Sequence, residues 1–171
     1  MAFEVQDGLN PTTTANAYIT VEEFDEFMTD RNYTNTYTEV QKKAAIIIAT
    51  EYLDIRFMYK DYKKLANQST EHPRNQYYDK EGRLVTNGIH PAIFIATMEY
   101  TRIALMNDLV PNPTPDASGK VVIYEREKVD VLETEKRYGA GGATEMPTYP
   151  TADNRLIKAG LVVRGNDLIR G

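Results

Sequence analysis

The sequence TEVQKKAAIIIATEYLDIRFMY, residues 38–59, contains the clearest structural pattern of the chain. Thr38 and Gln41 have the spacing of a capping box, in which each side chain binds a free backbone N–H of the other residue at a helix start. Apolar residues then recur at steps of three and four, which predicts an amphipathic helix of about five turns. The residues expected on its buried face are Val40, Ala44, Ile47, Ile48, Tyr52, Ile55 and Tyr59.

A shorter helix is predicted before it, again from a capping box. Thr20 and Glu23 have the required spacing, and three apolar residues then fall on one face of a helix that ends near Asn32. These apolar residues are Phe24, Phe27 and Met28. Residues 1–16 are polar and rich in turn-forming residues, so they are expected to form a loosely held, flexible N-terminal arm.

A third helix is predicted to begin at Pro91, because the missing N–H of proline costs nothing at the first helical position. From there to Met106 the only charged residues are Glu99 and Arg102. A helix this apolar is expected either at the centre of the domain or against a neighbouring subunit. Before it, residues 77–85 are predicted to form a small turn between short extended pieces.

The last third of the chain is predicted to contain a β-ribbon and a final helix. Residues 120–138 have β-type chemistry with balanced charges, which indicates a solvated ribbon that is marginal alone and needs a surface to pack on. Residues 149–171 are expected to form a short helix and an extended tail. The fold class is therefore mainly α: one domain over residues 1–171, with a small helical bundle at 17–110, a protruding β-ribbon and the extended C-terminal tail.

Composition excludes several classes of protein. The net charge of −5 argues against a duplex-DNA binder, whose affinity comes largely from neutralising phosphates. The absence of cysteine excludes disulfides and thiolate metal sites. No apolar run is long enough for a membrane span, and no signal peptide is expected. The 12 tyrosines suit either surfaces that become buried against other chains or the aromatic positions of the core.

The residues do not form a recognisable catalytic or cofactor site. The two histidines, His72 and His90, each precede a proline and are expected at turn or helix-start positions with solvated imidazoles. Ser69 and Ser118 lack the context of an activated nucleophile. No metal-ligand spacing is present, so no metal and no cofactor are expected, and we expect that the protein is not an enzyme.

Another possibility is a platform on which single-stranded nucleic acid stacks. Tyrosines and basic residues alternate between residues 59 and 78, a pattern that suits base stacking combined with phosphate contacts. Its members are Tyr59, Tyr62, Tyr77 and Tyr78 with Lys60, Lys63, Lys64 and Arg74. Such binding would weaken steeply with salt and would drop when Tyr77 or Tyr78 is replaced by alanine.

Three stretches, in order, resemble a phage family often labelled "DnaT-like single-stranded DNA-binding", whose members are head–tail connector adaptors. The stretches are AYITVEEFDEF at 17–27, AAIIIATEYLD at 44–54, and a third set formed by Pro73-Arg74, Asp79, Gly82, Ile89 and Pro91. The sequence departs from the family pattern at His72, where an aromatic residue usually precedes the Pro-Arg pair. It departs again at His90, which separates an isoleucine and a proline that are normally adjacent.

The resemblance implies a structural protein of the virion neck, assembled in the host cytoplasm. It implies a ring of twelve sister subunits below the portal protein, which extends the DNA channel without binding DNA specifically and docks the next neck or tail protein. No membrane partner is implied. Such a ring needs a head-to-tail interface on each subunit. The residues expected at the ring or tail-side interface are Tyr124, Val129, Val131 and Tyr138 of the ribbon.

The portal is expected to be contacted by residues 149–171. The apolar anchors expected there are Leu156, Ile157, Leu168 and Ile169. Deleting residues 162–171 would then abolish attachment to the portal without unfolding the monomer. The alternatives left open are a single-stranded nucleic-acid-binding accessory protein, an enzyme, and a different ring protein of the same particle such as a tail terminator.

Overall fold

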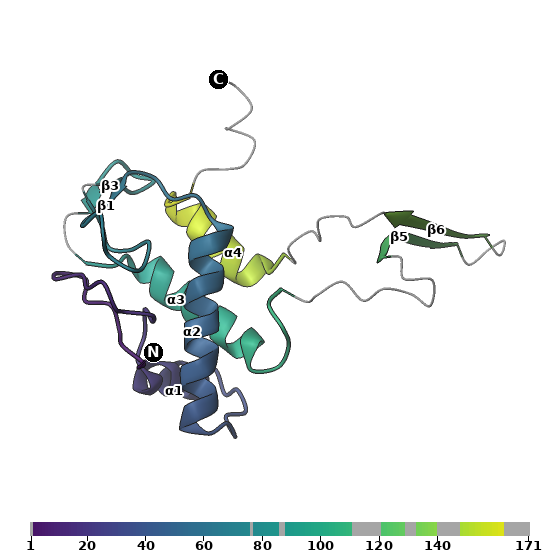
Figure 1. Ribbon diagram of the computed structural model, residues 1–171, viewed down its shortest axis with the longest axis horizontal. Coiled ribbons are helices and arrows are strands. Elements are labelled where there is room, and N and C mark those ends of the chain that lie inside the picture. Colours follow the sequence, from purple (N-terminus) through teal and green to yellow (C-terminus); the bar gives the residue numbers. More distant parts are fainter. Residues whose placement is uncertain are drawn as a thin grey trace. The chain divides into compact units, whose positions relative to one another are not determined.

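The computed structural model describes residues 2–75, 77–85, 88–110, 121–128, 133–139 and 148–162. The chain divides into two compact units, one made of residues 1–109 and 149–171 and the other of residues 110–148. The first unit contains four helices: α1 (Val21–Asp30), α2 (Glu39–Arg56), α3 (Pro91–Ala104) and α4 (Pro150–Ala159). The mainly α class with a small helical bundle is confirmed (Figure 1). None of the described helices is long and apolar enough to cross a membrane.

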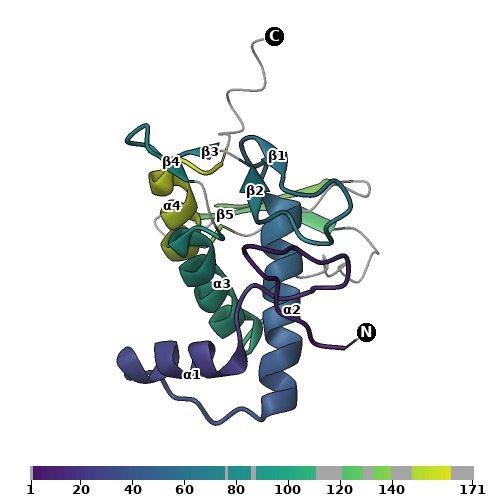
Figure 2. The same cartoon turned by 90° about the vertical axis from the view of Figure 1, so that its left-hand side faces the viewer.

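The bundle is built around α3. This helix packs against α2 on one side and against α4 on the other, and α1 contacts α2. Figure 2 shows α1 lying across one end of α2, while α4 lies nearer the other end. Fully buried apolar side chains from all four helices form the core: Phe24, Ile46, Ala49, Leu53, Ile93, Ala96, Tyr100, Ala152 and Leu156.

The helix starts follow the local sequence signals. Both capping boxes are confirmed, with Glu23 accepting from the N–H of Thr20 at 2.7 Å and Gln41 from the N–H of Thr38 at 2.9 Å. Pro91 begins α3 as expected. His90 is the N-cap of this helix, and its Nδ1 accepts a hydrogen bond from the N–H of Ala92 at 3.0 Å.

The face that α2 buries differs from the prediction. The core side consists mainly of Ala45, Ile46, Ala49 and Leu53. Val40 and Ile55 are 77% and 78% exposed, and Ile48 is 47% exposed. The helix has two apolar faces at helical spacing, and the alanines on one of them allow close packing against α3. The prediction for Tyr52 was right and that for Val40, Ala44, Ile48 and Ile55 was wrong.

The N-terminal arm also differs from the prediction, because residues 2–16 are not loosely held. The N–H of Gln6 donates to the carbonyl of Ala17 at 2.8 Å, and Val5 and Ala17 form a parallel bridge. Ala15 is buried, and its carbonyl accepts from the Ser69 hydroxyl at 2.5 Å. Ser69 lies on a loop more than fifty residues away, so the local sequence contains no sign of this contact.

Short antiparallel strand pairs complete the described structure. In the first unit, β1 (Tyr62–Lys63) pairs with β2 (Arg74–Asn75), and β3 (Tyr77–Tyr78) pairs with β4 (Leu84–Val85) around the predicted turn. In the second unit, β5 (Val121–Lys128) and β6 (Glu133–Gly139) form an antiparallel ribbon, which confirms the ribbon predicted at 120–138.

Candidate functional site

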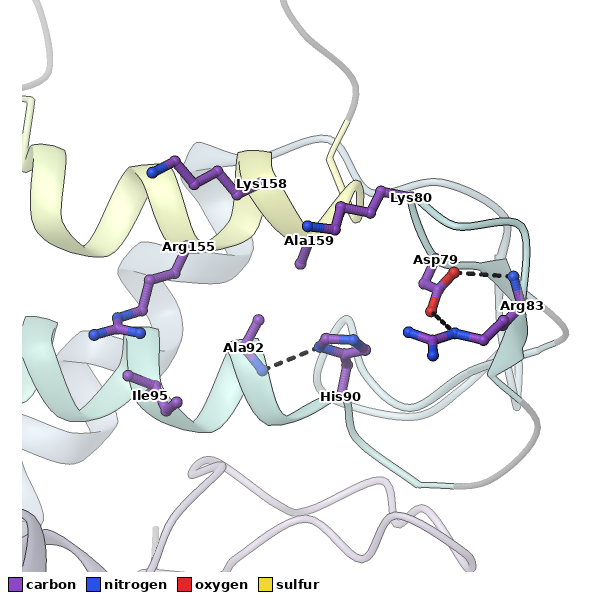
Figure 3. A pocket seen from close by; sticks show the side chains of 9 residues that line it. All are labelled: Asp79, Lys80, Arg83, His90, Ala92, Ile95, Arg155, Lys158 and Ala159. Atoms are coloured by element: carbon purple, nitrogen blue, oxygen red, sulfur yellow. Dashed lines mark hydrogen bonds and ion pairs between the residues drawn. The ribbon is translucent and has the colours of Figure 1, made fainter.

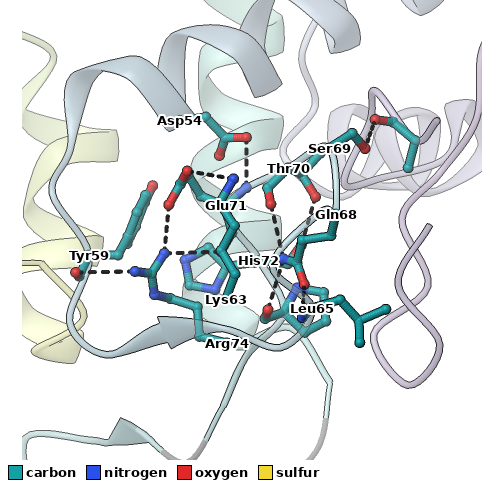
Figure 4. Close-up of polar contacts among 12 residues, drawn as sticks. Asp54, Tyr59, Lys63, Leu65, Gln68, Ser69, Thr70, Glu71, His72 and Arg74 are labelled. Atoms are coloured by element: carbon teal, nitrogen blue, oxygen red, sulfur yellow. Dashed lines mark hydrogen bonds and ion pairs between the residues drawn. The ribbon is translucent and has the colours of Figure 1, made fainter. Parts of the chain in front are cut away.

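The three stretches at 17–27, 44–54 and 73–91 meet in one buried polar cluster. The hydroxyl of Tyr18 donates to Oδ1 of Asp54 at 2.5 Å and accepts from the N–H of His72 at 3.0 Å. The other oxygen of Asp54 accepts from the N–H of Glu71 at 3.0 Å, as drawn in Figure 4. One residue from each stretch, or next to it, is therefore joined in a single network that fixes the loop 68–75 to α2.

Burial shifts the pKa values of Asp54 and His72 in this cluster. It raises the pKa of the Asp54 carboxyl to about 7, although the hydrogen bonds from Tyr18 and Glu71 act in the opposite direction. Burial, with the nearby charge of Arg74, lowers the pKa of His72 to about 3, so this imidazole is neutral. Its ring packs edge-to-face on Tyr59 at 4.5 Å and on Tyr18 at 6.1 Å. His72 thus occupies an aromatic environment, and the expectation of a solvated imidazole at this position was wrong.

Arg74, beside this cluster, holds the chain that leaves α2. Its Nε donates to the carbonyl of Lys60 at 2.7 Å and its Nη2 to that of Asp61 at 2.5 Å. Its Nη1 also lies 2.6 Å from the Glu71 carboxylate, which Lys63 contacts at 2.9 Å (Figure 4). These groups bind one another rather than facing an open cavity. The arrangement therefore stabilises the fold and offers no activated nucleophile.

A second buried network fixes α4 to the bundle. The Asp153 carboxylate accepts from Nη2 of Arg56 at 2.8 Å, from the hydroxyl of Tyr100, and from the N–H of Tyr149 at 3.2 Å. The rings of Tyr52, Tyr100 and Tyr149 pack edge-to-face around it. Helix α4 is therefore part of the core of the first unit.

This packing corrects the predicted portal anchors. Leu156 is fully buried against the bundle, so it is not available to a partner. Ile157 is half-buried, and Leu168 and Ile169 lie outside the described residues. Val162 is buried and forms a bridge with Tyr59, so a deletion that tests portal attachment must begin at residue 163. The sequence showed that this helix is amphipathic but not that α3 covers its apolar face.

The other predicted contact residues are only partly placed. Tyr124 lies on β5 opposite Arg137, and Tyr138 lies on β6 opposite Val122. Val129 and Val131 lie outside the described residues. In the predicted stacking platform, Tyr59 is buried, while Lys63 and Arg74 bind Glu71. Tyr62 and Tyr78 remain 83% and 58% exposed, so part of that platform is available to a ligand.

The sequence reasoning missed a cationic hollow of about 370 Å³ between α4, the start of α3 and the β3–β4 turn. Figure 3 shows Arg155 reaching from α4 towards Ile95 of α3, and Lys80 extending from the turn beside Ala159. Lys158 also lines it. The only local signal was the three-residue spacing of Arg155 and Lys158, which places both on one side of α4.

Metal ligands do not gather in the described part of the chain, where no group of three or more His, Asp or Glu side chains could hold an ion.

In comparisons with known proteins, a family model matches this chain, whereas no individual protein does. No curated protein and no solved structure matches the chain. A family model described as "Putative DnaT-like ssDNA binding protein" matches residues 1–168, which extends beyond the three resembling stretches at both ends. The match spans the helical bundle, both polar networks and the cationic hollow. The chain therefore belongs to this DnaT-like family.

Proposed function

We propose that this protein is a structural component of a tailed-phage virion, a head-to-tail adaptor that forms a ring below the portal. The ring extends the DNA channel and docks the next neck or tail protein. The ordered resemblance at 17–27, 44–54 and 73–91 supports this assignment. The acidic balance of the chain also suits a channel wall past which DNA slides without sticking.

The observation that carries the proposal is the apolar face that α2 leaves exposed, here called the α2 stripe. Its residues are Val40, Ala44, Ile48 and Ile55, spaced by four, four and seven positions along one side of the helix. Exposed Glu51 interrupts the stripe between Ile48 and Ile55. Single exposed apolar residues are ordinary, but four on one side of a helix are typical of a surface that another protein covers. A ring of identical subunits provides such a surface, since each copy covers its neighbour.

Two further regions are proposed to contact the portal and the other neck proteins. Ile157, Leu168 and Ile169 remain the proposed portal anchors, without Leu156. The β5–β6 ribbon is proposed to contact sister subunits or the tail-side partner. In this assignment the protein resides in the virion neck after assembly in the host cytoplasm, in a ring of twelve subunits.

The double variant Ile48→Glu/Ile55→Glu tests the proposal. Both side chains are exposed in the subunit, so the variant should keep the wild-type Tm, while charges introduced into a buried contact should prevent ring formation. Electron microscopy of the protein mixed with portal is the measurement. Met106→Glu, which introduces a charge at an exposed apolar position outside α2, is the control. Rings of normal appearance from the double variant would refute the role of the α2 stripe.

A second candidate function is binding of single-stranded nucleic acid in an accessory role. The description of the family supports it, as do the exposed rings of Tyr62 and Tyr78 and the exposed Lys60 two residues before Tyr62. Aromatic rings stack on bases of any sequence, and cations beside them neutralise phosphates.

The variant Tyr62→Ala/Tyr78→Ala tests this second function. Stacking contributes roughly 1–3 kcal/mol per base, so affinity for a fluorescent oligodeoxynucleotide should fall at least fivefold, as measured by fluorescence anisotropy. Tyr33→Ala, an exposed tyrosine on the α1–α2 connection, is the matched control and should bind as wild type does. Equal losses in both variants would show that these two rings have no special role.

A further inference from the structure

A second hollow on α4 shares two lining residues with the cationic one. It has a volume of about 420 Å³ and is lined by Pro150, Thr151 and Asn154 together with the same Arg155 and Lys158. Arg155 and Lys158 therefore line both hollows. We call the two hollows together the α4 groove. A groove with cations in the middle and open space on both sides fits a chain-like anion better than a compact one.

The charge of the α4 groove is positive in a chain that is acidic overall. Among the described residues that line either hollow, Asp79 is the only carboxylate, and it binds Arg83 at 2.9 Å. Arg83 in turn contacts Glu81 at 2.7 Å, so the charge of Arg83 is compensated locally. The remaining cations are Lys80, Arg155 and Lys158, which form no ion pair with the side chains described for the rest of the chain.

The fold holds these three cations together. Gly160 ends α4 with φ of +74°, a conformation that glycine adopts without strain. A Cβ at this position would lie 3.2 Å from the backbone nitrogen and the Cβ of Lys80, so the absent side chain lets the β3–β4 turn pack closely on the end of α4. Lys80 thereby lies next to Ala159 and lines the same hollow as Arg155 and Lys158, which are 75 residues or more away in the sequence.

We infer that the α4 groove binds the phosphodiester backbone of single-stranded nucleic acid, independently of base sequence. Three cations that form no ion pair with the described side chains line this groove, and such a concentration of positive charge suits the phosphates of a nucleic-acid strand. A peptide that adds a strand is a poorer match, because the described lining of the two hollows belongs to helices and a turn and offers no strand for pairing. Tyr78 is exposed two residues before Lys80 on the same hairpin and offers a ring for a base next to the groove. This inference rests on the second candidate function and is independent of the adaptor proposal.

The test is the binding of a fluorescein-labelled oligothymidylate by the full chain, measured by anisotropy between 50 and 200 mM NaCl. In Arg155→Ala/Lys158→Ala the affinity should fall roughly tenfold or more at the lowest salt. The slope of log K against log salt should also become shallower by about 1.4, which corresponds to two lost phosphate contacts on a single strand. Arg31→Ala/Lys43→Ala removes the same charge from residues elsewhere on the surface and should change the slope little.

The other outcomes overturn the inference in distinguishable ways. If wild type binds and the two double variants behave alike, the α4 groove is not the site, although the single-strand function stands. If wild type binds no oligothymidylate, the second candidate function and the inference fail together. If an acidic polyglutamate peptide then binds in a manner that depends on Arg155 and Lys158, the groove is a protein-docking surface. Thermal melting of each variant establishes that it is folded.

Discussion

Replacing Leu53 by alanine should lower the free energy of unfolding by about 2–5 kcal/mol, because it leaves a cavity in a fully buried part of the core. Replacing Ile55, two residues later on the same helix, should cost less than about 0.5 kcal/mol, because its side chain already faces solvent. Urea denaturation of both variants measures the difference. Since both substitutions are on α2, the difference between them measures how much more a side chain on the buried face stabilises the fold than one on the exposed face.

The comparison needs dilute protein, because association would stabilise the folded state and hide the exposure of Ile55. Similar losses in the two variants would mean that the α2 stripe is covered in the isolated subunit. In that case the observation behind the proposed ring would disappear. If only Leu53→Ala lowers the free energy of unfolding strongly, the α2 stripe is exposed in the isolated subunit. It is then available to a second copy.

Asp54 should make the protein less stable as the pH rises from about 4 to 7. Burial raises the pKa of its carboxyl in the folded state to about 7, from an ordinary value of 3.8. The folded state therefore holds the proton more tightly than the unfolded state does. The resulting stabilisation is complete below the unfolded pKa and is lost as the pH rises through the folded pKa. Over this range the loss is roughly 4 kcal/mol.

The variant Asp54→Asn isolates this contribution, because asparagine keeps the shape and does not titrate. The difference in unfolding free energy between wild type and variant should decline from pH 4 to pH 7, as measured by denaturation at several pH values. Asp79→Asn is the control, because the contribution of Asp79 to stability changes with pH in the opposite direction. The N–H of Arg83 lowers the pKa of Asp79, so its stabilisation is present at higher pH and is lost on acidification. A flat difference for Asp54→Asn would show that its carboxylate is solvated.

The two histidines at which the sequence departs from the pattern of the resemblance both have structural contacts. The resemblance leads us to expect an aromatic residue at position 72, and the neutral ring of His72 packs edge-to-face on Tyr18 and Tyr59. His90 adds a residue before Pro91, and its side chain caps α3. Each histidine therefore has a structural role in the fold.

The sequence by itself determined the features that depend on neighbours within one helical turn or one hairpin. The capping boxes at Thr20 and Thr38, the start of α3 at Pro91 and the antiparallel ribbon all follow from residues close together in the chain. These signals are local because a helix start or a turn is stabilised by hydrogen bonds between nearby groups.

Only the tertiary structure decided which surfaces are covered. It buried Leu53 instead of Ile55, enclosed Leu156, fixed the N-terminal arm to Ser69 and brought Lys80 to α4. In each case the partner lies on a distant segment, and two apolar faces of similar pattern cannot be distinguished until one of them meets that partner. The candidate surfaces for assembly and for nucleic acid are what remains after this selection, because packing between distant segments determines which side chains stay exposed.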